Sequence, residues 1–423
     1  MRRLSLLLSF VIISCFSSAY TQGRNNSVLF IGNSYTSSNN LPEMVFQISF
    51  HAGKPYSYST DFVETPGGAT FQQHCSNRSM SLIQEGGWNY VILQEQSQLP
   101  SFPIHQVENE CFPYAQQLVD SIYAHSYCAT PIFFMTWGRE NGDQENAQYF
   151  PPLGTYEGMD SLLYARYMIM KEENDAAVAP VGRVWRYIRK KHPEIKLYQE
   201  DGSHPSLLGT YAAACTFFTI IHQSDPREIN HYENLDESVA RTIIEAVRTV
   251  VYDSLDNWLR VKPSADFSAT INGYSVQFEN QSELAHSYKW IFENGDTSLA
   301  ENAVYTFSEV GNHTVTLIAE RHCTYDTIQK VITIDSNASI AGVYDIDNLK
   351  VYPNPTKDIV FIDNASKRIH SVALIDATGR ILISQDVNDN STSLNLQNMQ
   401  RGLYILAVYT HKDAPIYRKI IVE

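Results

Sequence analysis

The chain reads Val28-Leu29-Phe30-Ile31-Gly32-Asn33-Ser34 near its start, an uninterrupted apolar run followed by glycine and two polar residues. A short run without apolar–polar alternation is typical of a strand that is buried on both faces, as in a parallel sheet. The pattern returns in two later runs, Tyr90-Val91-Ile92-Leu93 and Ile132-Phe133-Phe134-Met135. These runs predict a parallel sheet, with Ser34 directly after its first strand.

Segments with helical periodicity lie between and after these runs. Apolar residues recur at helical spacing over residues 41–50, 104–124, 159–173, 181–191, 206–222 and 235–259. Strands that alternate with helices predict an α/β unit, a three-layer α/β/α sandwich around a parallel sheet. We expect this unit to span residues 22–262.

After Pro263 the pattern changes to short segments in which apolar and polar residues alternate. Residues 274–278 and 313–318 are examples, and Asn-Gly turns begin at Asn272 and Asn294. Alternation between such turns predicts antiparallel strands. We expect one all-β sandwich module at residues 263–335, a linker at 336–348, and a second all-β sandwich module at 349–423.

The first residues have the pattern of an export signal. Arg2 and Arg3 precede an apolar run that ends at Phe16, and small residues follow. This arrangement predicts a secretory signal peptide at residues 1–21. No later apolar run is long enough to span a membrane, so we expect no transmembrane segment in the mature chain.

The net charge indicates which partners the chain can bind, and the cysteine spacing bears on metal sites and disulfide bonds. The chain has 46 Asp and Glu residues against 31 Lys and Arg, and its formal net charge is −15. An acidic chain repels phosphate backbones, so we expect no nucleic-acid partner. The six cysteines show no metal-binding spacing, and we expect no metal site and mostly free thiols. Cys111 and Cys128 flank a predicted helix and should not pair with each other.

Three residues have the types and positions of a hydrolytic triad. Ser34 directly follows the carboxyl end of a predicted strand. In parallel-sheet proteins, ligands bind at this end of the strands. Asp201 and His204 stand three residues apart on a loop before a predicted helix. The carboxylate can hold the imidazole in the tautomer that accepts a serine proton. The alternative is that Ser34 caps a helix and His204 is an ordinary turn residue.

These blocks resemble those of the SGNH (GDSL-like) hydrolases. Gly32-Asn33-Ser34 is similar to the family's nucleophile block, and Asp201 to His204 is similar to its Asp-x-x-His block. The resemblance implies a flavodoxin-like sheet and a reaction without cofactor or metal. It also implies that Ser34 is the nucleophile, His204 the general base and Asp201 the residue that orients His204.

The resemblance also implies an oxyanion hole, where this sequence departs from the family pattern. The backbone N–H groups of Ser34 and Gly68 would contribute, because Gly68 stands in a Thr-Pro-Gly-Gly stretch similar to the family's second block. The third block normally supplies an asparagine, which is absent here. A glutamine amide can donate the same bond, and Gln94 is preferred over Gln96 and Gln98, which stay open.

Other residues at the same edge are candidates for substrate contacts. Trp137, Arg139 and His74 fall on the side of Ser34 and are candidates to line the pocket. The alternative is that at least two of them are packed inside or belong to exposed loops. The segment from Gly138 to Gly158 exceeds ordinary connection lengths, which predicts a lid or specificity loop.

The downstream modules carry two further resemblances. Residues 288–298 and 305–317 look like the signature stretches of a PKD β-sandwich. Residues 351–423 are similar to the C-terminal sorting domain that the type IX secretion machinery reads. This implies a protein that is exported through the periplasm and is secreted or attached to the cell surface. The alternative is that both modules are spacers.

Together these observations predict a secreted serine esterase, a hydrolase that acts on ester bonds. The expected substrate is a small acyl ester, and O-acetyl groups on carbohydrate are the first choice. A lipase or arylesterase of the same fold is an alternative. So is a catalytically silent protein that binds carbohydrate at a surface.

Overall fold

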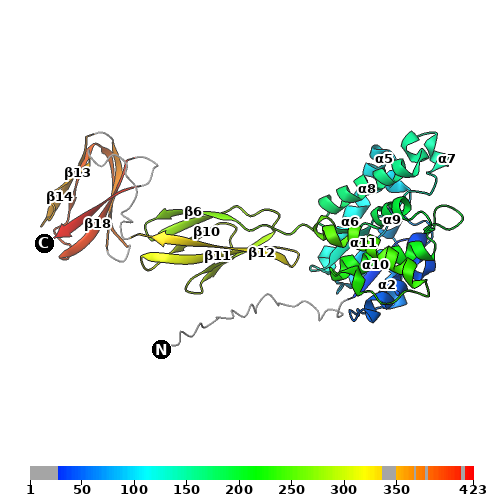
Figure 1. Cartoon of the computed structure of the whole chain (residues 1–423). Helices are drawn as coiled ribbons and strands as arrows, with labels where there is room; N and C mark the ends of the chain where they lie inside the picture. The colour runs from blue at the N-terminus through cyan, green and yellow to red at the C-terminus, as the bar shows by residue number, and fades with distance from the viewer. Residues whose placement is uncertain (1–26, 336–348, 366–367, 377–379, 411–414) are drawn as a thin grey trace, which may run out of the picture. The chain divides into compact units, whose positions relative to one another are not determined.

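The structure is a computed structural model that describes residues 27–335, 349–365, 368–376, 380–410 and 415–423 (Figure 1). The predicted signal peptide and linker lie outside the described residues. The chain divides into two compact units. Unit 1 contains the chain up to Ser264 together with Leu284–His286 and Ala319–Asp326, and unit 2 contains Ala265–Glu283, Ser287–Ile318 and Thr327–Glu423.

The central sheet of unit 1 has five parallel strands in the order β2-β1-β3-β4-β5. The strands are β1 (Val28–Ile31), β2 (Val63–Glu64), β3 (Tyr90–Leu93), β4 (Thr130–Phe134) and β5 (Ala177–Ala179). Every residue of β1 is buried, as its apolar sequence predicts. Ile31 pairs with Leu93, so β1 and β3 end at the same edge, where the strand order reverses and a crevice is expected. The predicted α/β class is confirmed.

The helices of unit 1 form two groups. Helices α2, α9, α10 and α11 pack together, and α4, α6 and α8 form the second group. Right-handed crossovers that run in opposite directions from β1 and β3 place the groups on opposite faces. The helices are α1 (Ser34–Ser37), α2 (Leu41–His51), α3 (Phe71–His74), α4 (Arg78–Glu85), α5 (Ile104–Glu110), α6 (Phe112–His125), α7 (Gln144–Ala147), α8 (Tyr156–Glu173), α9 (Val181–Lys191), α10 (Leu207–His222) and α11 (Glu237–Val250).

Short 3₁₀ segments connect these elements, and two predicted helices are broken. The 3₁₀ segments are η1 (Ser38–Asn40), η2 (Thr60–Phe62), η3 (Leu99–Ser101), η4 (Pro151–Gly154), η5 (Pro226–Glu228) and η6 (Tyr252–Asn257). The helix expected at 104–124 is interrupted at Cys111, because Pro113 lies in the first turn of α6 and has no N–H to continue the preceding helix. The helix expected at 235–259 ends at Val250 and continues as η6.

One disulfide bond lies within unit 1. Cys128 bonds to Cys323, 195 positions away. Beside it Arg321 forms a 2.8 Å ion pair with Asp175, and the His322 ring stacks on Tyr123 with 3.6 Å between centroids. Cys75, Cys111 and Cys215 are free, so most of the described thiols are unpaired, as expected. The sequence did not reveal the Cys128–Cys323 pair.

Unit 2 consists of antiparallel sheets with two separate cores, one around Phe267 and Trp290 and one around Val360 and Leu406. The strand orders are β10-β7-β6 and β12-β11-β8-β9 before the linker, and β13-β14-β17 and β16-β15-β18-β19 after it. The strands are β6 (Phe267–Asn272), β7 (Ser275–Asn280), β8 (Ser287–Phe292), β9 (Thr297–Ser298), β10 (Ala303–Thr306), β11 (Gly311–Arg321), β12 (Thr324–Ile334), β13 (Leu349–Tyr352), β14 (Ile359–Asn364), β15 (Ile369–Ile375), β16 (Ile381–Asp389), β17 (Ser391–Asn395), β18 (Gly402–Tyr409) and β19 (Ile416–Val422). Among the described residues, no helix has the length and apolar character needed to cross a membrane.

Candidate active site

Asn33 and Gly32 fix the turn that carries Ser34. Asn33 caps α1, because its side chain accepts a hydrogen bond from the Tyr35 N–H at 3.1 Å. Gly32 precedes it in a space where a Cβ would come within 2.3 Å of Thr36 Oγ1 and 2.8 Å of Gln94 Oε1. Only glycine fits there. The turn therefore presents Ser34 as the first residue of α1, at the carboxyl end of β1.

The structure brings Ser34, His204 and Asp201 together in one chain of contacts. Ser34 Oγ lies 2.9 Å from His204 Nε2, although the residues are 170 positions apart. His204 Nδ1 lies 2.5 Å from Asp201 Oδ2. With Nδ1 protonated toward the carboxylate, Nε2 is free to accept the serine proton. The arrangement has the geometry of a nucleophile, a base and an orienting carboxylate.

The loop between Asp201 and His204 is fixed by its own backbone. Asp201 Oδ1 accepts hydrogen bonds from the N–H groups of Ser203 and His204, both at 2.9 Å. Burial alone would raise the pKa of Asp201, but the bonds from His204 and from the two backbone N–H groups outweigh it and lower the pKa. Gly202 adopts a φ of 64°, and its carbonyl oxygen accepts a 2.8 Å bond from the Glu140 N–H. Asp201 therefore stays ionised beside His204.

Two aromatic side chains, Trp137 and Tyr35, contact the loop between Asp201 and His204. Trp137 Nε1 donates a 3.0 Å hydrogen bond to the carbonyl oxygen of Ser203. The Tyr35 ring stacks on Trp137 at 4.8 Å, and Tyr35 Oη lies 2.6 Å from Ser203 Oγ. The Tyr35 ring also meets the His204 ring edge to face at 5.3 Å. The sequence did not show these supporting roles, although Tyr35 directly follows the serine.

The three candidate pocket residues have different positions. Trp137 and His74 are fully packed: His74 Nε2 contacts the Gly32 carbonyl oxygen at 3.0 Å, and its Nδ1 contacts Ser79 Oγ at 2.7 Å. Arg139 is partly exposed and pairs with Asp143 at 3.3 Å. The alternative that at least two of the three are packed inside therefore describes the structure better.

Two backbone N–H groups near Ser34 have no partner among the described residues, those of Ser34 and Gly68. Gly68 stands at a φ of 69°, and the turn around it is closed by a bond from the Ala69 N–H to the Pro66 carbonyl oxygen. Asn33 Nδ2 donates to the Ala69 carbonyl oxygen at 3.1 Å, which links the turn of Gly68 to the turn of Ser34. Nothing lies within 4 Å of the position that a Gly68 Cβ would take, so space is open in front of it.

Gln94 lies beneath the serine turn and is fully buried. Its Oε1 accepts bonds from the Asn33 N–H at 3.0 Å and from Thr36 Oγ1 at 2.8 Å. Its Nε2 donates to the Glu95 carbonyl oxygen at 2.5 Å. These contacts hold the turn and differ from those expected of a donor that faces Ser34 Oγ. The role of Gln94 in an oxyanion hole stays a prediction.

The other two glutamines of the third block are also engaged. Gln96 Oε1 accepts bonds from the N–H groups of Gln98 and Leu99, and its Nε2 donates to Gln98 Oε1 at 3.2 Å. Gln98 Nε2 donates to Asp143 Oδ2 at 2.6 Å. Asp143 is buried and caps α7. The segment expected to form a lid is thus tied to the third block by Gln98 and Asp143.

A buried carboxyl group, Glu95, lies next to this network. Its Oε1 accepts bonds from the N–H groups of Phe71 and Gln96 at 3.0 and 2.6 Å, and its Oε2 is buried without a hydrogen-bond partner among the described residues. Burial raises the pKa of Glu95 to about 8. No local sequence pattern shows that Glu95 is buried, so its position comes from the structure alone. Within the described ranges, no group of three His, Cys, Asp or Glu residues is arranged to hold a metal ion.

Parts of the chain are similar to solved structures. A DUF4886 family protein from Bacteroides uniformis is 15% identical with a TM-score of 0.44, covering 54% of this chain and 94% of that protein. A proposed SGNH hydrolase from Slackia heliotrinireducens is 22% identical with a TM-score of 0.37, covering 46% and 97%. The PKD1 domain of the Vibrio cholerae metalloprotease PrtV is 31% identical with a TM-score of 0.17, covering 18% and 100%.

No curated protein matches the chain. The C-terminal module, however, matches a known family. Residues 350–423 match the family described as the secretion system C-terminal sorting domain. The match confirms the sorting domain that the sequence predicts for this end of the chain.

Proposed function

We propose that unit 1 is a serine esterase with Ser34 as nucleophile. Ser34 Oγ attacks the carbonyl carbon of an ester while its proton passes to His204 Nε2. The tetrahedral intermediate collapses, His204 returns the proton to the leaving alcohol oxygen, and an acyl group remains on Ser34. Water then attacks the acyl group while His204 takes its proton, and His204 passes that proton to Ser34 Oγ as the carboxylic acid is released.

In this proposal the N–H groups of Ser34 and Gly68 stabilise the oxyanion, since both are free of other hydrogen bonds. Donors that are fixed before the reaction stabilise the developing charge without reorganisation. The Gln94 amide is the third candidate donor, and it would have to leave the Glu95 carbonyl oxygen to take part. Asp201 remains ionised and stabilises the imidazolium form of His204. The reaction as proposed needs no cofactor or metal.

The proposed substrate is a small acyl ester, with O-acetyl groups on carbohydrate as the first choice. Ser34 is half-buried and the turn of Gly68 is exposed, which supports access of a substrate to the serine from solvent. The sorting-domain match at 350–423 supports export by the type IX secretion machinery to the exterior or the cell surface. Extracellular polymers are available there.

The observation that carries the proposal is the continuous contact from Ser34 Oγ through His204 to Asp201, at 2.9 and 2.5 Å. The test is release of acetate from acetylated xylan and of nitrophenol from p-nitrophenyl acetate and octanoate. Ser34→Ala should abolish turnover, whereas Ser37→Ala, an exposed serine on the same helix, should not. Activity that survives Ser34→Ala would overturn the proposal. Faster turnover of octanoate than of acetate would favour the lipase alternative.

A further inference from the structure

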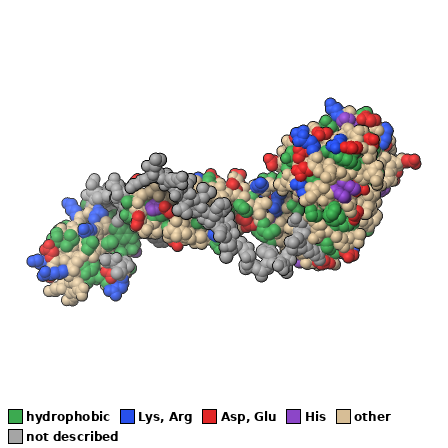
Figure 2. Space-filling model, turned by 60° about the horizontal axis from the view of Figure 1, so that its bottom comes forward, with side chains coloured by type: hydrophobic (Ala, Val, Ile, Leu, Met, Phe, Trp, Pro, Cys, Tyr) green, Lys and Arg blue, Asp and Glu red, His purple; other side chains and the backbone are tan. Residues whose placement is uncertain are grey.

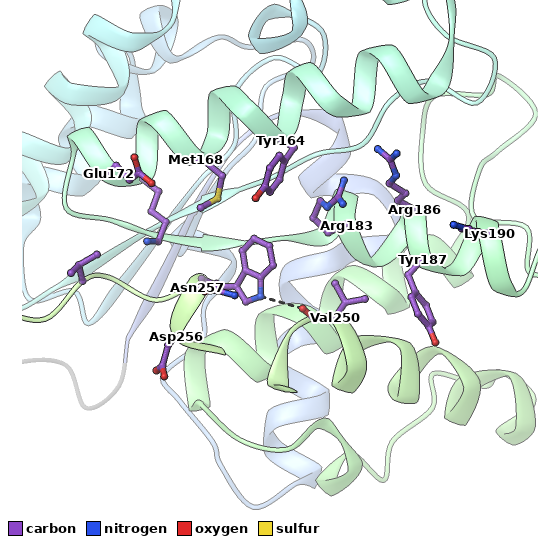
Figure 3. A pocket seen from close by; sticks show the side chains of 13 residues that line it. Tyr164, Met168, Glu172, Arg183, Arg186, Tyr187, Lys190, Val250, Asp256 and Asn257 are labelled. Carbon is purple, nitrogen blue, oxygen red and sulfur yellow. Dashed lines mark hydrogen bonds between the residues drawn. The ribbon is translucent and has the colours of Figure 1, made fainter. Parts of the chain in front are cut away.

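A hollow of about 770 Å³ lies in unit 1 between α8, α9 and the segment that follows α11 (Figure 3). Its volume falls in the range of roughly 300–1,000 Å³ that is usual for ligand pockets. None of its lining residues belongs to the candidate active site. We call this hollow the α8–α9 groove. Acidic and basic side chains are mixed on the face of unit 1 that Figure 2 shows.

Basic side chains outnumber acidic ones along the groove. Its lining includes four basic residues and two acidic ones, Lys171, Arg183, Arg186, Lys190, Glu172 and Asp256. On α9 the basic residues recur at helical spacing, so they share one face of that helix. This excess stands against a net charge of −15 for the whole chain. The groove is therefore suited to an anionic ligand.

A buried carboxylate positions the two arginines. Asp160 is 2% exposed, and its Oδ2 accepts bonds from Arg183 at 3.3 Å and from Arg186 at 2.8 Å. Two guanidinium groups on one carboxylate leave one positive charge uncompensated. Each guanidinium also keeps N–H donors that Asp160 does not use, and such planar donors suit carboxylate and sulfate groups. The arginine pair is thus fixed before any ligand arrives.

Lys171 adds a buried cation that forms no direct ion pair with its neighbouring carboxylates, Glu172 and Asp175, in the described part of the chain. Lys171 is only 5% exposed and makes no ion pair within the described part of the chain. Burial lowers the pKa of Lys171, although Glu172 and Asp175 lie near enough to oppose this effect. An anionic group in the groove would supply the missing charge.

Aromatic rings complete the lining. Tyr164 is 37% exposed and points toward Arg183, whose guanidinium lies 4.8 Å from the ring centroid (Figure 3). Tyr187 and Trp258 also line the groove, and Trp258 Nε1 is bound to the Val250 carbonyl oxygen at 3.2 Å. Rings with a flat apolar face and a polar edge pack well against sugar rings, which have the same two characters.

The hollow continues along α9. A second hollow of about 300 Å³ shares Tyr187 with the first and is lined by His192 and Arg241. Two adjacent hollows that share an aromatic residue fit an extended polymer better than a single compact molecule. The second hollow adds no excess of positive charge, because Arg241 pairs with Glu237 at 2.7 Å and Glu245 also lines it.

We propose that the α8–α9 groove binds a chain of acidic sugars, with carboxylate or sulfate groups on the arginines and Lys171 and sugar rings on the tyrosines. This site lies outside the proposed esterase centre and does not depend on its activity. It would hold the enzyme on an acidic polysaccharide whether or not that polymer carries the hydrolysed ester.

The test is calorimetric titration of the chain from residue 22 to 423 carrying Ser34→Ala, so that no ester is consumed. The probes are oligogalacturonate, chondroitin sulfate oligosaccharide, a neutral xylo-oligosaccharide of similar length, and single-stranded DNA. The proposal expects binding of at least one acidic glycan that weakens with salt, and no comparable binding of the neutral glycan or the DNA. The tighter of the two acidic probes identifies the anionic group.

Two variants test the location. Arg186→Gln with Lys190→Gln should weaken acidic-glycan binding at least about tenfold, because two charge-assisted contacts are lost. Since Arg186 contacts buried Asp160, the pair Tyr187→Ala and Lys190→Gln provides a second variant that leaves Asp160 untouched, and melting curves check folding. The control Lys191→Gln, at the next position outside the groove, should change binding less than about twofold. The proposal is overturned if neither acidic probe binds, if the neutral glycan or DNA binds equally, or if the control weakens binding as much as the variants.

Discussion

Trp137 Nε1 donates a 3.0 Å hydrogen bond to the carbonyl oxygen of Ser203, which lies 66 positions further along the chain. Ser203 stands between Asp201 and His204, so this bond connects the end of β4 to the loop of the proposed base. Trp137 is itself stacked between Tyr35 at 4.8 Å and Trp185 at 3.7 Å. One side chain therefore supports both the residue after the nucleophile and the loop that carries the base.

We predict that Trp137→Phe slows the proposed esterase while leaving the chain folded. Phenylalanine keeps a ring between Tyr35 and Trp185 but cannot donate to the Ser203 carbonyl oxygen. A displaced His204 should lower kcat roughly 10- to 100-fold with little change in KM, measured on p-nitrophenyl acetate. Trp185→Phe is the matched control, because Trp185 stacks on Trp137 and its Nε1 donates no hydrogen bond to the described residues. Equal losses of kcat in both variants would show that packing alone is responsible.

We predict that Gln94→Ala affects both stability and turnover. The buried amide accepts from the Asn33 N–H and Thr36 Oγ1, so its removal leaves two buried donors unpaired and should lower the free energy of unfolding by about 1–3 kcal/mol. If Gln94 also donates to the oxyanion, kcat should fall on the order of 10²–10³ with KM unchanged. Urea unfolding and steady-state kinetics separate the two effects. A kcat near that of the unchanged chain would remove Gln94 from the oxyanion hole.

Glu95 predicts a pH dependence of stability. Burial raises its pKa to about 8 in the folded chain, above the ordinary value of 4.5. Between these values the unfolded chain has released a proton that the folded chain still holds, so stability from this group is full at low pH and is lost as pH rises to about 8. Glu95→Gln should therefore stabilise the chain progressively from pH 5 to 8.5, by on the order of a few kcal/mol.

Urea unfolding across that pH range measures the effect of Glu95→Gln. Glu108→Gln, an exposed position on α5, serves as the control and should leave the pH profile unchanged. Parallel stability curves for Glu95→Gln and the original chain would mean that Glu95 is ionised in the folded state at neutral pH.

The disulfide bond between Cys128 and Cys323 predicts a redox dependence of stability. It joins residues that are 195 positions apart, so Cys323→Ser should lower the free energy of unfolding by roughly 2–5 kcal/mol. Reducing agent should lower the melting temperature of the original chain and leave that of Cys323→Ser unchanged. The control Cys75→Ser removes a free, half-buried thiol and should stay sensitive to reducing agent. A native chain in which both Cys128 and Cys323 react with a thiol reagent would contradict the pairing.

The sequence predicted what depends on local pattern. The apolar run of β1 predicted a strand buried on both faces, and all of its residues are buried. The spacing of Asp201 and His204 predicted a contact between them, since three residues on a loop can bring the side chains together. Placement after parallel strands then predicted that Ser34 would meet that loop, and the 2.9 Å contact is what the structure has.

What the sequence left open depends on contacts between distant residues. The partner of Cys128 lies 195 positions away, and no local pattern selects it. The position of Gln94 directly after a strand predicts that its amide donates into the pocket. In the structure, hydrogen bonds from the Asn33 N–H and Thr36 Oγ1 fix the orientation of that amide. The position of Trp137 shortly after β4 likewise predicts a pocket residue, but its ring stacks on Tyr35 inside the fold.

The most direct test of the account is covalent labelling of the chain from residue 22 to 423 by a fluorophosphonate, followed by intact mass and peptide mapping. The reagent reacts with a serine only where a neighbouring base activates it. The account predicts a single adduct on Ser34, full labelling of Ser37→Ala, and no labelling of Ser34→Ala or His204→Ala. An unlabelled chain that is folded, or an adduct on any other residue, would contradict the claim that Ser34, His204 and Asp201 form a working catalytic site.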